Sequence, residues 1–265
     1  MAIEQTELVR LLEEALFLMP TDRGDIGELG IPDVRGRMTP ISHPMANLVG
    51  CVPRAEGLSD ATIQEVVRRF RSQNKAFGWV TGPLSPEGLE RRLIANRLVK
   101  IDEFSGMVLS DLARPIVTRP GVRVVEVPVE ERDRFQSLLS MTFQLPPDVA
   151  AFMSDVLYFN PSHLKVRNYF AFLGGVDEPV GLGSTMYMPE SSVVLLAGSA
   201  TLTEYRHRGV YRGLVARRVD DARKDGAAAA IIQAARTTSA PICQKMGFAE
   251  VCQQALYMWE PDVPA

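Results

Sequence analysis

A short basic segment holds the residues whose types and spacing best suit chemistry. The sequence TLTEYRHRGVYRGL, residues 201–214, follows an apolar stretch and leads into a helical pattern, and it carries three arginines around Gly209. A helix N-terminus exposes unpaired N–H groups and the positive end of the helix dipole. A glycine there lets the backbone approach an anion closely. The segment predicts a pyrophosphate site, although an ordinary basic loop before a helix has the same local spacing.

The elements that must position this segment follow from hydrophobic periodicity and turn residues. Pro115, Pro120 and Gly121 lie in a stretch of little periodicity, and we place a domain boundary there, giving domains 1–118 and 119–265. The second domain is predicted to hold strands and helices in the order strand 123–129, helices 130–143 and 147–157, strands 166–173, 180–188 and 193–202, helix 210–224, strand 228–235, helix 239–246 and strand 254–259.

The first domain shows a weak internal repeat of the second. A helical pattern around Leu8–Leu16 comes first, followed by a strand at 45–52. The order helix 61–73, strand 76–81, helix 86–98 and strand 107–112 then matches the order of the last four elements of the second domain. Ser59 or Asp60 is the predicted N-cap of the first of these helices. Residue identity between the halves is low, so the match is one of pattern only.

Composition bounds the possible functions. The chain has 265 residues, 46% of them hydrophobic and 23% charged, with a formal net charge of −3. These are globular values, and no net basic field favours nucleic acid. The longest apolar runs are far shorter than a membrane span, so we expect no membrane partner. The three cysteines and three histidines have no metal-ligand spacing, so we predict no metal site and a reducing, cytoplasmic compartment.

Two motifs in this order resemble the GCN5-related N-acetyltransferase (GNAT) superfamily. The basic segment resembles its acetyl-CoA loop, Gln/Arg-x-x-Gly-x-Gly/Ala, and TTSAPICQKMGF at 237–248 resembles the later helix that closes in Gly-Phe. The resemblance covers roughly residues 122–260. It implies an α/β (α+β) protein with a mixed, mostly antiparallel sheet flanked by helices. It also implies a tandem form, whose N-terminal domain is a second, degenerate GNAT-like half that binds no CoA. A dinucleotide fold is disfavoured because no G-x-G-x-x-G occurs, and no Walker loop is present.

The resemblance also implies site residues for acetyl-CoA, the acyl donor. Backbone groups of Ser199, Ala200 and Thr201 would pair with the pantetheine arm, which would enter where strands 193–202 and 228–235 separate. The pyrophosphate would be held by the amides of one run of residues: Arg208, Gly209, Val210, Tyr211, Arg212 and Gly213.

This sequence departs from the family pattern at three positions. Tyr211 stands at a small-residue position, so its side chain must point away from the phosphates. Arg236 replaces a common asparagine. Cys243 replaces a tyrosine that serves as general acid, so it is either a proton donor or a small packed residue. No general base is visible. Tyr187 and Tyr257 are aromatic candidates with a hydroxyl, although a tyrosine in such a position is more often a core or rim residue.

The resulting hypothesis is transfer of an acetyl group from acetyl-CoA to a primary amine by direct attack within a ternary complex. The acceptor would be a small molecule or a peptide, and the sequence leaves its identity and the oligomeric state open. A catalytically inactive CoA-binding sensor or structural protein with the same fold is the alternative. A nucleotide-binding protein is a third reading. In the degenerate half, Trp79 and Phe77 are predicted to be core residues rather than pocket lining.

Overall fold

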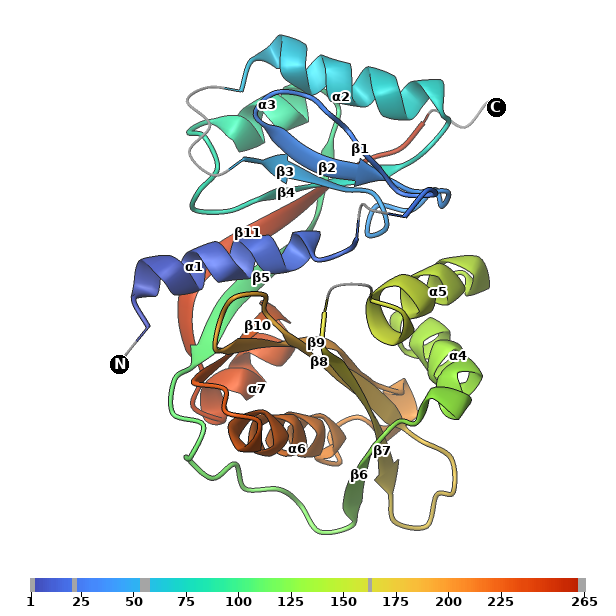
Figure 1. The fold of residues 1–265 in the computed structure, drawn as a ribbon, viewed down its shortest axis with the longest axis vertical. Helices are drawn as coiled ribbons and strands as arrows, with labels where there is room; N and C mark the ends of the chain where they lie inside the picture. The colour runs from blue at the N-terminus through green and yellow to red at the C-terminus, as the bar shows by residue number, and fades with distance from the viewer. Residues whose placement is uncertain (1–2, 21–22, 53–57, 162–163, 262–265) are drawn as a thin grey trace. The chain divides into compact units, whose positions relative to one another are not determined.

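The computed structural model describes residues 3–20, 23–52, 58–161 and 164–261, and the chain forms two compact units (Figure 1). Unit 1 comprises Met1–Ala15 and Gly106–Val251, and unit 2 comprises Leu16–Ser105 and Cys252–Ala265. This division differs from the predicted contiguous domains that meet at residue 118. The physical reason is that two long strands, β5 (Val99–Leu109) and β11 (Ala249–Trp259), each begin in one unit and end in the other.

Unit 1 is built on a mixed, mostly antiparallel sheet, as predicted. Besides β5, its strands are β6 (Val122–Glu126), β7 (Val166–Leu173), β8 (Gly181–Tyr187), β9 (Val193–Thr201) and β10 (Ala229–Ala235). Their order is β5-β10-β9-β8-β7-β6. The neighbours from β6 to β9 are antiparallel, whereas β9 and β10 are parallel. A parallel pair needs a crossover connection, and here a helix provides it.

Helices cover both faces of this sheet. They are α1 (Gln5–Glu14), α4 (Arg132–Phe143), α5 (Pro147–Met153), α6 (Val210–Lys224) and α7 (Ser239–Lys245), with helical turns at Val129–Glu131, Ser154–Phe159 and Thr203–Tyr205. Two consecutive residues of β7, whose side chains point to opposite faces of the sheet, show which helix lies on which side. Tyr169 packs with Leu214 of α6, whereas the ring of Phe170 lies 6.0 Å from that of Phe135 in α4. Thus α6 and α4 cover opposite faces, as Figure 1 shows.

The crossover helix α6 has the bounds that the periodicity predicts, 210–224. Its buried face includes Val210, Leu214 and Val215. Two i,i+4 ion pairs lie along the helix: Lys224 with Asp220 on the exposed face, and Arg217 with the buried carboxylate of Asp221. An exposed pair such as Lys224 with Asp220 adds little stability, so packing of the apolar face on the sheet is the main stabilising contribution.

Unit 2 repeats this arrangement on a smaller scale. Its elements are the helical turn Ala15–Phe17, which it shares with unit 1, β1 (Gly27–Glu28), β2 (Val34–Met38), β3 (Leu48–Cys51), α2 (Asp60–Ser72), β4 (Phe77–Thr81) and α3 (Leu89–Ala95). The strand order is β1-β2-β3-β4-β11. Strands β3 and β4 are parallel through Leu48 with Gly78 and Val49 with Trp79, and β4 is antiparallel to β11.

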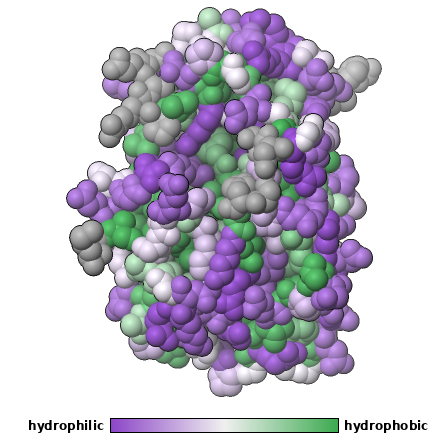
Figure 2. Space-filling model, viewed as in Figure 1, coloured by the Kyte–Doolittle hydropathy of each residue, from purple (hydrophilic) through white to green (hydrophobic). Residues whose placement is uncertain are grey.

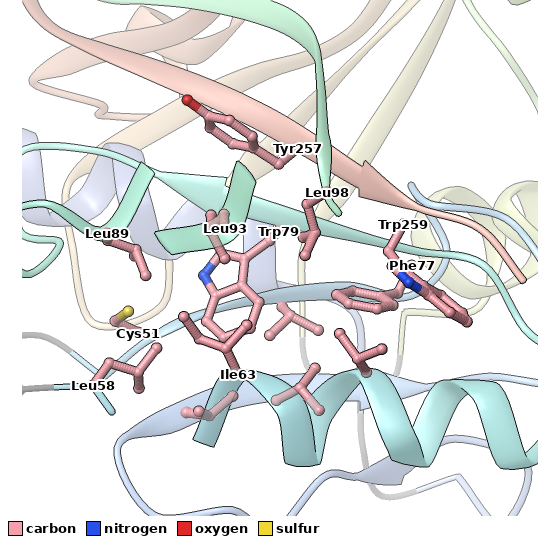
Figure 3. Packing of buried hydrophobic residues seen from close by; sticks show 14 of the residues in the cluster. Cys51, Leu58, Ile63, Phe77, Trp79, Leu89, Leu93, Leu98, Tyr257 and Trp259 are labelled. Atoms are coloured by element: carbon pink, nitrogen blue, oxygen red, sulfur yellow. The ribbon is translucent and has the colours of Figure 1, made fainter. Parts of the chain in front are cut away.

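The core of unit 2 lies between these strands and its two helices (Figure 3). Phe77 and Trp79 are fully buried, and the Phe77 ring stacks on Phe70 of α2 at 4.5 Å. The prediction that both aromatics are core residues is confirmed. Tyr257 is also fully buried here, with its hydroxyl directed away from the cluster in Figure 3. The catalytic candidacy of Tyr257 is therefore set aside in favour of a core role.

The internal repeat is present at the level of element order and pairing. The run β3-α2-β4-α3-β5 corresponds to β9-α6-β10-α7-β11, and the first two strands of each run are parallel. Some predicted boundaries are wrong: α3 spans Leu89–Ala95 instead of 86–98, β5 spans Val99–Leu109 instead of 107–112, and β11 begins at Ala249 instead of residue 254. Ser85 accepts a hydrogen bond from the Gly82 amide in a turn, and Gly88 takes a left-handed φ of 72° before the helix starts.

Hydrophobic residues are scattered among hydrophilic ones on the face shown in Figure 2. Among the described helices none has the length and apolarity to cross a membrane. Within the same residues, no group of three or more His, Cys, Asp or Glu side chains is arranged to hold a metal ion.

Candidate functional site

The two parallel strands of unit 1 separate part-way along their length. Pairing joins Val193 to Ala229 and ends with Leu195 and Ile231, although β9 continues to Thr201 and β10 to Ala235. On its other side β9 stays paired with β8 as far as Thr201. One backbone edge of β9 beyond Leu195 is therefore released from β10. The four residues from Ala197 to Ala200 are partly exposed, whereas those before them are buried.

A bulge distorts β9 at the point of separation. Leu182 pairs with Ala200 and Ser184 with Ala197, so Gly198 and Ser199 together face the single residue Gly183. Gly198 has a left-handed φ of 53°, and a Cβ there would lie 2.6 Å from the Tyr158 hydroxyl. Only glycine fits this position. The bulge re-aims the strand so that residues 199–201 continue along the open edge.

The N-terminus of α6 lies at the end of the turn that follows β9. Gly209 is its N-cap, with a left-handed φ of 88° and no side chain to cap the helix. His207 is also left-handed, with φ 64°. The first N–H groups of α6, from Val210 to Arg212, therefore have no acceptor within the helix. They point out of the positive end of a 15-residue helix dipole. Such an arrangement can bind an anion, and the pyrophosphate contact itself stays a prediction.

Two arginines connect this turn to the segment before β6. Arg119 donates from Nη1 to the His207 carbonyl at 2.9 Å, and a Cβ on Gly209 would lie 3.0 Å from the Arg119 side chain. Arg212 donates from Nη1 to the Val117 carbonyl at 3.4 Å. Arg119 was not among the predicted site residues, because a residue in an irregular, proline-containing stretch carries no periodic signal of its destination. It adds a cation directly beside the glycine.

The predicted catalytic cysteine lies in the core of unit 1. Cys243 of α7 is fully buried, and burial raises the pKa of its thiol. Its Sγ lies 3.5 Å from the Tyr211 hydroxyl. Tyr211 therefore points into the core, and its side chain packs against the same cluster as Cys243. Its size at that position predicted only that it would point away from the phosphates. Burial also raises the pKa of Tyr211, which stays a neutral hydrogen-bond donor.

A buried arginine that sequence reasoning missed lies on the same face of α6. Arg218 is fully buried and donates to three carbonyls, those of Leu214 (Nε, 3.1 Å), Ser184 (Nη1, 2.9 Å) and Ala197 (Nη1, 3.2 Å). Its Nη2 is buried without a hydrogen-bond partner. The only available signal was an arginine on the apolar stripe Tyr211, Leu214, Val215 and Arg218, which a sequence reader takes for an exposed residue.

The structure places the other predicted catalytic residue away from the open edge. Tyr187 pairs with Val194, where β9 and β10 are still joined. Its hydroxyl donates to Asp225, the C-cap of α6, and burial together with this bond raises its pKa to about 12. A helix of 15 residues separates Asp225 from Gly209, which is roughly 22 Å at 1.5 Å per residue. This placement argues against a catalytic role for Tyr187.

Comparison with known proteins identifies the fold. No protein-family model matches the sequence, and no curated protein is similar to it at a significant level. A solved structure of a GCN5-related N-acetyltransferase from Kribbella flavida superposes with a TM-score of 0.70 at 13% identity, covering 99% of this chain and 97% of that one. The chain has the GNAT fold. The mixed sheet with one separating parallel pair is the architecture that the resemblance predicted.

Two further solved structures support the GNAT fold over the full chain. A GCN5-related N-acetyltransferase from Sphaerobacter thermophilus has a TM-score of 0.64 at 14% identity, covering 100% of this chain and 96% of the other. A tandem GNAT protein from the clavulanic acid biosynthesis pathway has a TM-score of 0.58 at 11% identity, covering 100% and 98%. The likeness to a tandem GNAT protein agrees with the repeat seen in the two units. At these identities the likeness shows the fold.

Proposed function

We propose that the protein is an acyltransferase that moves an acetyl group from acetyl-CoA to a primary amine. One observation carries the proposal: the uncapped N-terminus of α6 lies directly after the strand whose edge is released from its parallel neighbour. An anion site at the end of an open strand edge suits a donor with a pyrophosphate at one end and an amide-containing arm at the other.

The residues present fit this donor. Among the amides predicted to hold the pyrophosphate, those of Val210–Arg212 have no acceptor within α6, and Arg119 is an added cation beside them. The Gly213 amide already donates to the Gly209 carbonyl at 2.9 Å, so it is the weakest member of the predicted set. Backbone groups of Ser199, Ala200 and Thr201 lie on the released edge and offer the arm strand-like hydrogen bonds. Tyr211 does not obstruct the phosphates, because its side chain packs toward Cys243.

The protein's contribution to the reaction is positioning and polarisation. A backbone N–H on the open edge of β9, near Ala200 or Thr201, donates to the thioester carbonyl and stabilises the negative charge that develops there. Holding donor and amine together removes the entropic cost of their encounter. The amine must be neutral to attack. The nine residues of β9 include no acidic or basic side chain, so this strand offers no general base. In this proposal the surplus proton of the amine passes to solvent.

Isothermal titration of the purified protein with acetyl-CoA tests the donor site. Release of free thiol in the presence of a panel of amines, covering small polyamines, amino acids, aminoglycosides and lysine peptides, tests the transfer. We expect saturable binding and thiol release that depends on one class of amine. Absence of acetyl-CoA binding at millimolar concentration would rule out the proposal.

A CoA-binding sensor with the same fold is the second candidate. The buried position of Cys243 and the pairing of Tyr187 with Asp225 favour it, because neither predicted catalytic side chain faces the open edge. Under this alternative acetyl-CoA binds with the same affinity, but no amine releases thiol from it above the rate in free solution.

A further inference from the structure

The most unusual charged group in unit 1 is the guanidinium of Arg218. Among the described residues no aspartate or glutamate forms an ion pair with it, although it is fully buried. Burying a cation without an anion is costly, and three carbonyls offset only part of that cost. Burial lowers the pKa of Arg218 to about 10, so the group remains a cation at neutral pH. A buried cation that lacks a counter-ion and has one N–H donor without an acceptor is suited to bind an anion.

The sheet is shaped to hold this guanidinium against the bulge of β9. A Cβ on Gly183 would lie 3.1 Å from Arg218 Cζ and Nη1, and 3.3 Å from the Ser199 hydroxyl. The missing side chain of Gly183 thus lets the cation lie flat on the backbone beside Ser199. Its bond to the Ala197 carbonyl fixes it at the last residue before the bulge. The cation therefore lies over the paired strands β8 and β9, two residues beyond Leu195, the vertex where β9 and β10 part.

The groups that surround Arg218 are weak acids and not carboxylates. Tyr211 of α6, Tyr169 of β7 and Cys243 of α7 interact with it electrostatically. The nearest carboxylate on its own helix, Asp221, is engaged by Arg217 and by the Tyr169 hydroxyl. At positions i and i+7 of α6, Tyr211 and Arg218 project from one face, so a hydroxyl donor and a cation line the same buried strip.

The position of this strip relates it to the donor of the proposed function. The anion site at Gly209 holds the phosphate end, and the arm runs along β9 from Thr201 back toward the vertex. The end of the arm that carries the sulfur then reaches Ala197, where Arg218 lies. We propose that Arg218, with Tyr211 as a hydrogen-bond donor, holds the sulfur of CoA as a thiolate. This inference rests on the proposed function and names the group that replaces the family's acid.

The transfer step balances without a side-chain acid. The amine nitrogen forms a bond to the carbonyl carbon, and the C–S bond breaks with its electron pair going to sulfur. The nitrogen's surplus proton goes to water. Arg218 and the neutral Tyr211 hydroxyl stabilise the sulfur anion, so no proton has to reach it before the C–S bond breaks. Cys243 would then need no chemical role, and its burial beside Tyr211 would be packing.

Equilibrium binding of CoA and desulfo-CoA, measured by calorimetry between pH 6.5 and pH 9, tests the inference without turnover. The two ligands differ only at sulfur. If Arg218 favours the thiolate, the bound thiol has a lowered pKa, and the ratio of CoA affinity to desulfo-CoA affinity rises with pH. Each unit of lowering gives up to about a tenfold rise. Arg218 stays charged over this range, because its pKa is about 10.

Variants test whether the Arg218 charge causes the rise of the affinity ratio with pH. Arg218→Met should abolish the rise, and Arg218→Lys should retain part of it because the cation remains. Arg223→Met is the matched control, because Arg223 lies on the same helix but is exposed and pairs with Asp220. It should keep the full rise. If Arg218→Met fails to fold, Tyr211→Phe, which keeps the ring, provides the second test and should reduce the rise.

The outcomes distinguish failure of the proposed acetyl-CoA site from failure of the proposed thiolate site. If neither ligand binds at any pH, the proposed function is wrong. If both bind with a ratio that does not change with pH, or if the Arg218 and Tyr211 variants keep the full rise, the thiolate site is wrong while the donor site stands.

Discussion

The two crossover helices, α2 in unit 2 and α6 in unit 1, begin in opposite ways. Ser59 caps α2, its hydroxyl accepting a hydrogen bond from the Thr62 amide at 3.1 Å. Gly209 begins α6 with no side chain at all. Both helices connect two parallel strands, so the same orphan N–H groups arise in each. In α2 the protein satisfies a donor itself, and in α6 it leaves the donors for a ligand.

The strands beside these helices differ in the same sense. In unit 2 the residue pair Val49 and Trp79 is fully buried, and the core of that unit closes over it. In unit 1 the released edge of β9 stays partly exposed. Two local differences, an uncapped helix and an open strand edge, therefore distinguish the unit that we propose binds acetyl-CoA. Unit 2 lacks the uncapped helix N-terminus, because Ser59 caps α2. This agrees with the hypothesis that unit 2 binds no CoA.

Replacing Gly209 with aspartate gives the largest expected effect. A carboxylate at the head of α6 would repel the pyrophosphate and fill the space that the backbone needs, so acetyl-CoA binding should fall below detection by calorimetry. Gly226→Asp is the matched control, because Gly226 has nearly the same φ of 87° at the other end of α6 and open space around it. Equal acetyl-CoA affinity in the two variants would contradict the site.

Removal of the Arg119 side chain should have a smaller effect. Arg119→Ala deletes one cation beside Gly209, and acetyl-CoA affinity should fall about tenfold, the equivalent of one charge-assisted hydrogen bond of ~1.5 kcal/mol. The loss should shrink in high salt. Arg223→Ala, which removes an arginine from the far end of α6, is expected to bind like the parent. A variant of Arg119 with parental affinity at low salt would remove this residue from the site.

Removal of the Ser59 cap tests the corresponding helix of unit 2, where we expect an effect on stability and none on ligand binding. Ser59→Ala should lower the free energy of unfolding by about 1 kcal/mol, the usual cost of an N-cap, and should leave acetyl-CoA affinity unchanged. Urea denaturation and calorimetry measure the two quantities. Ser72→Ala, at the exposed C-terminal end of α2, should change stability by less than about 0.5 kcal/mol. If loss of the cap weakened acetyl-CoA binding, α2 would belong to the site after all.

The C-terminal end of α6 supplies the smallest prediction. Hydrogen bonds from Lys165 and Tyr187 lower the pKa of Asp225 to about 2. A carboxylate with a lowered pKa stabilises the fold above its unfolded pKa of about 3.9, and that stabilisation is lost as pH falls toward 2. Between pH 5 and pH 2.5 the unfolding free energy of Asp225→Asn should therefore fall less than that of the parent. An identical fall in both would show that the bonds do not operate in solution.

Sequence reasoning succeeded where one physical signal dominates. A regular apolar stripe predicts the helix at 210–224. The glycine before it predicts a turn, because the start of a helix near an anion requires a residue without a side chain. Tyr211 was predicted to point away from the phosphates because of its size at a small-residue position, and its packing against Cys243 agrees with that. The predicted amide contacts of residues 199–201 and 208–213 remain proposals, because they depend on a ligand.

The failures concern long-range placement. Arg119 and Arg218 were missed, because an irregular segment and a buried cation are decided by tertiary packing and not by local pattern. The role offered to Tyr187 depended on which end of β9 opens, and only strand register shows that. The predicted boundary at residue 118 followed prolines and glycines, whereas the units are divided within β5 and β11.

The passage of β5 and β11 between the units has a consequence for synthesis. Strand β4 pairs through residues 77–81 with residues 255–259 of β11. On a ribosome this partner emerges only after residues 106–251 of unit 1 have been made. Unit 2, although most of it is encoded early, therefore cannot complete its sheet before unit 1 has been synthesised. Until then β4 stays unpaired on that side, and its free edge can pair with another chain.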